Sequence, residues 1–115
     1  MSRPKRSILA QFRSGILPLK VETGRFQQIP VEDRTCNFCS GLEIEDEKHF
    51  LFDCCLYNSL RDTLFEKVCI LYPEFSALHT TDKVELLMLK TPDLLANYIF
   101  DAFNMRKETM YNLER

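Results

Sequence analysis

The chain has 115 residues, of which 45% are hydrophobic and 28% charged, a balance typical of globular proteins and not of disordered or fibrous ones. This length suits a single domain over residues 1–115, and no apolar run approaches the roughly 20 residues that a membrane-spanning helix needs. The formal net charge of −2 argues against a chain that wraps nucleic acid over its whole surface and leaves local charged patches to decide its partners.

Residues 1–30 form a basic segment that contains one acid, Glu22. Residues 5–14 within it can form a short amphipathic helix, and Gly15 is expected to end that helix. The stretch 17–30 is interrupted by prolines and a glycine, so we expect a loop with one short strand. A mitochondrial presequence is an alternative interpretation of the acid-free N-terminus. The cations of this segment are Arg3, Lys5, Arg6, Arg13, Lys20 and Arg25.

The C-terminal part, residues 59–115, carries three expected helices. Ser59 can cap the first, whose apolar residues recur at helical spacing until Pro73 closes it. Asp82 is the expected cap of the second. Thr91 and Pro92 suit the cap and the first turn of the third, because proline lacks an N–H that this position does not need. Cys69 is expected in the core, and His79 in a loop or at a cap.

The cysteines point to a metal site. The chain has five of them and no apolar secretory leader, and an odd count in a leaderless chain argues against a disulfide framework. Four donors follow the pattern Cys36-x2-Cys39-x9-His49-x4-Cys54. Zn²⁺ takes four sulfur and imidazole ligands tetrahedrally, and a Cys-x2-Cys turn presents two thiolates to one side of the ion. We therefore predict a zinc-binding knuckle over residues 31–58.

Four protein ligands leave no position for water or a substrate, so such a site stabilises the fold and does not catalyse a reaction. The last ligand has an alternative, because Cys55 directly follows Cys54; the four-residue gap that zinc knuckles use favours Cys54. A competing interpretation treats the cysteines as small buried hydrophobic residues and His49 as an ordinary histidine. The acids between the ligand pairs are expected to form a solvated loop. These acids are Glu43, Glu45, Asp46 and Glu47.

The expected fold is mainly α: a small helical domain with a CCHC element like a zinc knuckle and short extended segments before it. No P-loop, dinucleotide fingerprint, nucleophile elbow or His-Glu-x-x-His helix occurs. We therefore expect a protein that is not an enzyme, has no small-molecule substrate and binds no membrane. Without a leader, it is expected inside the cell, in the nucleus or the cytoplasm, and not secreted.

Three segments carry a resemblance to a known family: LPLKVETGRF at 17–26, IPVEDRTC at 29–36 and DEKHFLFDC at 46–54. They are similar to the zinc-binding segment that follows the reverse transcriptase domain in non-LTR (LINE-type) retrotransposon proteins. The resemblance covers residues 8–65 well and the helical remainder, including AFNMRK at 102–107, loosely. It implies that the zinc ligands are Cys36, Cys39, His49 and Cys54.

Two departures from that family bear on function. Cys55 stands where the family usually has proline, which leaves a spare thiol. The chain also has no polymerase or endonuclease motif, so the resemblance implies a detached C-terminal piece, either a remnant of an element or a gene adopted by a host.

The resemblance implies a module that helps to engage RNA or target DNA. The candidate contacts are Arg13, Lys20, Arg25 and Arg34 for phosphates, and Phe38 or Phe26 for base stacking. In the alternative, zinc only holds the fold and the C-terminal helices bind protein, as in a homodimer. That alternative follows from the apolar residues spread around the last helix, namely Ile99, Phe100, Phe103 and Met105.

Overall fold

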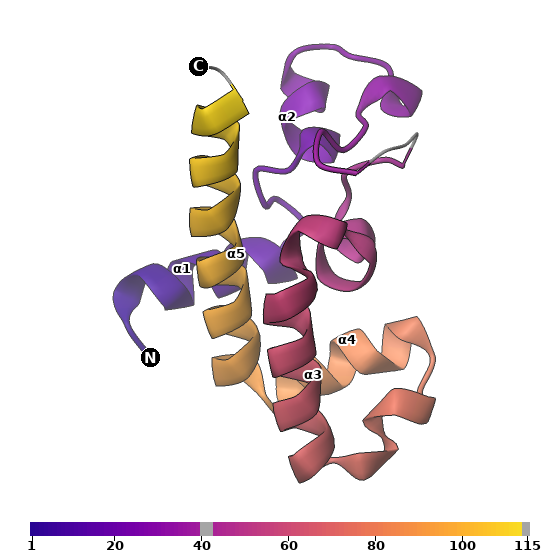
Figure 1. Ribbon diagram of the computed structural model, residues 1–115, viewed down its shortest axis with the longest axis vertical. Coiled ribbons are helices and arrows are strands. Elements are labelled where there is room, and N and C mark those ends of the chain that lie inside the picture. The colour runs from indigo at the N-terminus through magenta and orange to yellow at the C-terminus, as the bar shows by residue number, and fades with distance from the viewer. Residues whose placement is uncertain (40–42, 114–115) are drawn as a thin grey trace. The chain divides into compact units, whose positions relative to one another are not determined.

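The computed structural model describes residues 1–39 and 43–113 of the protein (Figure 1). The regular elements of these residues are helices and short 3-10 or π-helical turns (η), so the predicted mainly α fold class is confirmed. The extended structure in this part of the chain is one isolated bridge between Thr35 and Ile44. In chain order the elements are α1 (Arg3–Arg13), α2 (Lys20–Phe26), η1 (Val31–Asp33), η2 (His49–Asp53), η3 (Cys55–Tyr57), α3 (Asn58–Leu71), η4 (Pro73–Ala77), α4 (Thr80–Leu89) and α5 (Pro92–Leu113).

The chain divides into two compact units. The cysteine unit is Ala10–Asn58, and the helical unit consists of Met1–Leu9 together with Ser59–Arg115. The four metal-site residues all lie in the cysteine unit. The three predicted C-terminal helices lie in the helical unit, except that the first begins at Asn58. A single domain over the whole chain stays a prediction.

Gly15 ends α1, as predicted. Its φ of +70° lies in the left-handed region that glycine adopts without steric cost. The Gly15 amide donates to the Phe12 carbonyl at 3.1 Å, and the Ile16 amide donates to the Gln11 carbonyl at 3.0 Å. These two bonds form a Schellman motif, which satisfies carbonyls that the end of the helix would otherwise leave without partners.

The prediction of a loop and strand over residues 17–30 is wrong, because residues Lys20–Phe26 form α2. The error came from treating Gly24 as a chain breaker. A Cβ at this buried glycine would lie 2.7 Å from Cγ of Arg34, a separation that real side chains do not reach. Arg34 passes over the glycine and its Nε donates to the Ile29 carbonyl at 2.8 Å. Glycine at this position makes room for the arginine.

The N-terminus of α2 is stabilised from a distance. Leu19 occupies the N-cap position and makes no side-chain capping bond. Instead, the Lys20 amide donates to Oε1 of Glu45 at 2.7 Å, and Glu45 is only 2% exposed. A carboxylate at this end also interacts favourably with the helix dipole. The expectation that the acids form a solvated loop is therefore wrong for Glu45.

The C-terminal helices begin close to the predicted positions, with one exception. α3 begins at Asn58, one residue before Ser59, and α5 begins at Pro92. α4 begins at Thr80, with His79 at its N-cap position, so the predicted cap at Asp82 is wrong. Asp82 lies in the first turn, where its charge still favours the helix through the dipole.

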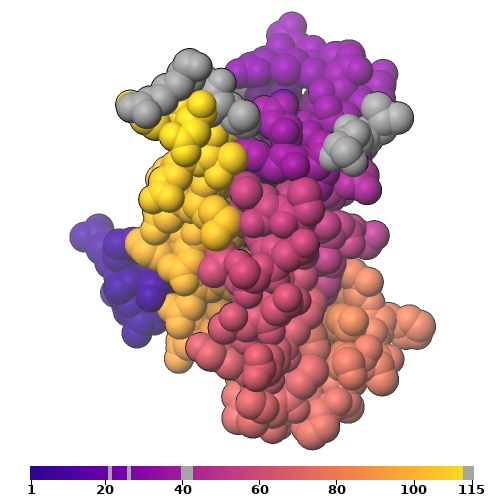
Figure 2. All heavy atoms as spheres, viewed as in Figure 1, coloured from indigo at the N-terminus to yellow at the C-terminus, as the bar shows by residue number. Residues whose placement is uncertain are grey.

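The core of the helical unit consists of aliphatic, small and aromatic side chains. Phe65 packs edge-on against Phe75 with ring centroids 5.3 Å apart, and the Lys83 ammonium lies over the Phe75 ring. Cys69, predicted in the core, is half-buried on α3. Figure 2 shows α3 and α5 side by side on one face of this unit. Its side chains with at most 1% exposure are Val68, Phe75, Leu87, Leu95, Ala96, Ile99 and Ala102.

The cysteine unit has its own small core beside the metal-site residues. Phe50 and Tyr57 are at most 1% exposed and meet edge-on with ring centroids 4.9 Å apart. Leu17, Leu19 and Leu51 are also buried. A core confined to Ala10–Asn58 supplies limited hydrophobic stabilisation because the unit is short, so an additional staple is valuable.

Candidate metal centre

The four donors predicted from spacing converge in the cysteine unit. Sγ of Cys36, Cys39 and Cys54 and a ring nitrogen of His49 all lie within 4.8 Å of one another. Cys54 Sγ is 3.7 Å from the sulfurs of Cys36 and Cys39, and Cys39 Sγ is 3.5 Å from His49 Nε2. Around tetrahedral zinc, bond lengths of about 2.3 Å to sulfur and about 2.0 Å to nitrogen require S···S near ~3.8 Å and S···N near ~3.5 Å. The residues fit a metal ion of this kind.

The first pair of donors is held by a turn that follows the Thr35–Ile44 bridge. The Cys36 amide donates to the Glu43 carbonyl at 2.8 Å, which fixes the backbone on one side of the turn. The Phe38 amide then donates to Sγ of Cys36 at 3.4 Å. An N–H directed at a sulfur stabilises its thiolate form, so the turn favours the ionised state that a metal ligand needs.

The second pair of donors is brought together by a π-helical turn, η2. Its wider i→i+5 hydrogen bond, from the Cys54 amide to the His49 carbonyl, measures 2.7 Å. A π turn places residues five apart on the same side, which is the spacing of His49 and Cys54. Asp46 fixes the start of this turn, because its Oδ1 accepts the His49 amide at 2.8 Å.

His49 presents the correct nitrogen to the cluster. Its Nε2 faces Cys39, while its Nδ1 lies 3.5 Å from Oε2 of Glu43. A carboxylate on the distal nitrogen is the usual outer partner of a metal-binding histidine, because it favours the tautomer that leaves the other nitrogen free to coordinate. His49 is buried at 4% exposure, which limits the access of water to the donor set.

The geometry favours Cys54 over Cys55 as the fourth donor. Cys54 is 1% exposed, and its sulfur approaches two other donors. Cys55 is exposed; its thiol donates to the Phe38 carbonyl at 3.4 Å. Its sulfur does lie 3.4 Å from that of Cys39, so the spare thiol is at the edge of the cluster.

Crowding makes the pKa values of the three thiol donors unequal. The hydrogen bond between the sulfurs of Cys36 and Cys54 lowers the pKa of Cys36 to about 5 against the opposing effect of burial. The same bond, together with burial, raises the pKa of Cys54. Burial also raises the pKa of Cys39. Ionisation of all three thiols calls for a cation among them, which is the role of a coordinated metal ion.

The residue spacing predicts the four donors but not the acids that support them. Glu43 faces His49. The carboxylate of Glu45 accepts the first amide of α2, and the carboxylate of Asp46 accepts the first amide of the π turn. For Asp46 a signal existed, because an aspartate three residues before a buried histidine and an apolar run is a helix-start pattern. For the two glutamates nothing in the local sequence distinguishes these roles from a solvated loop.

Two of the predicted nucleic-acid contacts take part in the fold of the cysteine unit. Arg34 packs over Gly24 and is hydrogen-bonded to a backbone carbonyl. Lys20 Nζ donates to Oδ1 of Asn37, which lies in the turn between Cys36 and Cys39. These two cations therefore stabilise the surroundings of the metal-site residues.

The remaining predicted contacts are more accessible. Arg13 is exposed, and the Arg25 side chain is 62% exposed although it pairs with Glu22 at 2.9 Å. Surface ion pairs contribute little free energy, so a phosphate can compete for Arg25. Phe38 is half-buried beside the cluster. The side chain of Phe26 lies outside the described part of the structure.

In comparison with known proteins, the chain matches no protein-family profile, no curated protein and no solved structure. Among the described residues, no helix combines the length and the apolar character needed to cross a membrane.

Proposed function

We propose that this chain is a non-catalytic module that binds one structural Zn²⁺ ion through Cys36, Cys39, His49 and Cys54, and that the zinc-stabilised cysteine unit binds RNA or single-stranded DNA. The observation that carries the proposal is the convergence of these four donor atoms within 4.8 Å. Four protein ligands close the coordination shell, and a closed shell serves folding rather than catalysis.

Energetics favour a structural role. Structural zinc in small modules contributes on the order of 10–16 kcal/mol of binding free energy, whereas a whole domain is stable by only about 5–15 kcal/mol. We therefore expect the short cysteine unit to depend on the metal for its stability. Three thiolates among the donors favour zinc over the hard cations Mg²⁺ and Ca²⁺, which prefer oxygen ligands.

Nucleic acid is the proposed partner for two reasons. The resemblance to the zinc-binding segment of LINE-type retrotransposon proteins supplies one, and we propose a common origin with that segment. The second is that the cysteine unit carries the accessible cations Arg13 and Arg25 and the half-buried ring of Phe38, since cations and an aromatic ring together suit a single strand. Acidic residues outnumber basic ones in Ala10–Asn58, so the contact is confined to a local patch. We propose the nucleus or the cytoplasm as the compartment in which this binding takes place.

The zinc site is tested by the metal content of the purified protein, measured by mass spectrometry. We expect one zinc per chain in the wild type and a substoichiometric amount in Cys36→Ser. Cys69→Ser is the matched control, because it removes a thiol from the helical unit. Wild-type protein without stoichiometric zinc would overturn the proposal.

Nucleic-acid binding is tested by titrating single-stranded RNA and DNA at several salt concentrations. The affinity should fall steeply with salt, because bound phosphates displace counterions. Arg13→Ala and Arg25→Ala should each reduce the affinity and the salt slope, whereas Lys107→Ala, an equal charge change on α5, should not. Absence of binding at low salt leaves the zinc site intact as a proposal and removes the nucleic-acid partner.

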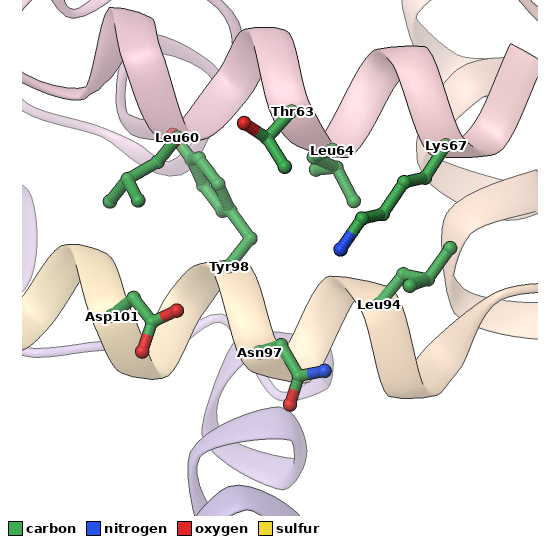
Figure 3. A pocket seen from close by; sticks show the side chains of 8 residues that line it. All are labelled: Leu60, Thr63, Leu64, Lys67, Leu94, Asn97, Tyr98 and Asp101. Atoms are coloured by element: carbon green, nitrogen blue, oxygen red, sulfur yellow. The ribbon is translucent and has the colours of Figure 1, made fainter.

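Self-association through the helical unit is a second candidate function, favoured by a groove between α3 and α5. Figure 3 shows side chains from both helices around this cavity of about 100 Å³. Leucines and Tyr98 supply its apolar surface, and the exposed Ile70 and Leu71 lie further along α3. The lining residues are Leu60, Thr63, Leu64, Lys67, Leu94, Asn97, Tyr98 and Asp101.

The charges of this groove suit a second copy of the chain. Lys67 lies at the end near Leu94, and Asp101 lies at the end near Leu60 (Figure 3). A two-fold axis through the middle of the groove would bring Lys67 of each copy to Asp101 of the other, as an isologous interface requires.

Three of the four residues from which a dimer was predicted are otherwise engaged. Ile99 and Phe103 are buried, and Phe100 lies beneath the Lys5 ammonium, 5.5 Å from the ring centroid. The groove is therefore the better candidate surface.

Light scattering during size exclusion tests this second function. Lys67→Glu and Asp101→Lys should each weaken a dimer, and the double variant should restore it because the opposed charges are merely exchanged. A wild type that remains monomeric at high concentration would remove the candidate.

A further inference from the structure

Cys55 is a thiol that the zinc site does not use. It is exposed and is the first residue of η3. Its sulfur lies 3.4 Å from Sγ of Cys39, and its backbone amide donates to the same Cys39 sulfur at 3.4 Å. Two independent contacts thus hold Cys55 against one donor of the cluster.

We propose that Cys55 and Cys39 form an oxidation-sensitive pair, in which a peroxide converts the two thiols to a disulfide and releases the metal ion. The inference rests on the proposed zinc site, because Cys39 is one of its four ligands. It adds a modification site and a means of regulation to that site.

The reaction is a two-electron oxidation. The Cys55 thiol loses its proton, and the thiolate attacks one oxygen of hydrogen peroxide; an S–O bond forms and the O–O bond breaks. The departing hydroxide takes up the proton to become one water, and Cys55 is left as a sulfenic acid. The Cys39 thiolate then attacks the Cys55 sulfur; an S–S bond forms, the S–O bond breaks, and the departing hydroxide takes a proton to become a second water. Cys39 no longer has a thiolate to donate to zinc, so three ligands remain and the affinity falls.

Exposure selects this pair from the other thiols. Sulfurs of Cys36 and Cys54 also lie 3.7 Å apart, but both residues are buried, at 5% and 1% exposure. Peroxide reaches an exposed thiol first. A disulfide needs the sulfurs at about 2.05 Å, so the Cys39 and Cys55 sulfurs require a small approach from 3.4 Å.

The proposal is tested on purified full-length protein whose zinc content has first been measured. Hydrogen peroxide is added, zinc release is followed with a chromogenic chelator, and disulfides are mapped by non-reducing peptide mass spectrometry. Wild type should release zinc and yield a Cys39–Cys55 cross-linked peptide, and a thiol reductant with added zinc should reverse both changes. Cys55→Ser should slow the release on the order of tenfold, while Cys69→Ser should release zinc like the wild type.

The outcomes separate this inference from the proposed function. Two results with zinc-loaded protein would overturn the inference and leave the zinc site standing. One is release of zinc from Cys55→Ser at the wild-type rate; the other is a cross-link in the wild type that joins Cys36 to Cys54. Protein purified without zinc overturns the zinc site and this inference with it.

Discussion

At the scale of single residues, the neighbouring Cys54 and Cys55 differ because the backbone turns between them. Cys54 ends the π turn with extended backbone (φ −64°, ψ 126°), and its sulfur enters the cluster. Cys55 begins the next helical turn and is exposed. Two chemically identical side chains are thereby assigned to a buried donor position and to a surface position.

This difference predicts the effect of replacing each cysteine by serine. Cys54→Ser should lower the zinc affinity by more than about 100-fold, since loss of an outer-shell partner alone costs about 10–100-fold. Cys55→Ser should leave the affinity under reducing conditions unchanged. Competition with a chelator of known affinity measures both. A larger loss in Cys55→Ser than in Cys54→Ser would show that Cys55 is the ligand.

Glu47 makes the stability of the cysteine unit sensitive to pH. Burial, with the neighbouring charges of Asp46 and Glu22, raises its pKa from 4.5 to about 7. A carboxyl group with a raised pKa binds its proton more tightly in the folded state, so its stabilising contribution is complete below pH 4.5 and is lost as the pH rises towards 7.

Glu47→Gln cannot ionise. Its melting temperature relative to that of the wild type should therefore be higher at pH 8 than at pH 5. Melting temperatures of the zinc-saturated proteins measure the gain. Glu32→Gln, at an exposed carboxylate in η1, is the control. An advantage of Glu47→Gln that is equal at both pH values contradicts the prediction.

At the scale of elements, α2 depends on contacts from other parts of the chain. Its amide terminus is satisfied by Glu45, and its glycine is covered by Arg34. Glycine inside a helix is less stable than alanine by roughly 1 kcal/mol. Glycine is nevertheless the residue that fits position 24, because a larger side chain would displace Arg34.

Gly24→Ala should accordingly destabilise the protein although alanine favours helices. Overpacking costs about 1–3 kcal/mol, against about 1 kcal/mol of gained propensity. In an Arg34→Ala background the same change should be neutral or stabilising, because the obstructing side chain is gone. The free energies of unfolding of the wild type, the two single variants and the double variant, measured in denaturant at saturating zinc, form a double-mutant cycle. Equal effects of Gly24→Ala in both backgrounds would contradict the packing argument.

At the scale of the whole molecule, the two units differ in what stabilises them. The helical unit has a core of fully buried apolar side chains, whereas the cysteine unit combines a core of this kind with a four-donor cluster. A bound metal ion stabilises the folded state by mass action. Loss of the ion therefore lowers the stability of the unit that binds it.

Removal of zinc with a chelator should therefore abolish amide-exchange protection in Ala10–Asn58 while protection persists at buried positions of α4 and α5 such as Leu87 and Ile99. Hydrogen exchange read by mass spectrometry checks this, and protection should return on adding zinc. Simultaneous loss of protection throughout the chain would contradict independent stabilisation of the two units.

The sequence by itself determined the features that depend on neighbouring residues. Gly15 as a helix stop, the starts of α3 and α5, and the spacing of the four donors all involve interactions over a few positions, which periodicity and capping patterns report. The mainly α class follows from these elements. The tertiary structure decided what depends on distant residues. Glu45 accepts the first amide of a helix 25 positions away, and Arg34 requires glycine at position 24. The π turn directs Cys54 inward. Burial and long-range hydrogen bonds decide these cases, and the sequence does not state which distant residues will meet.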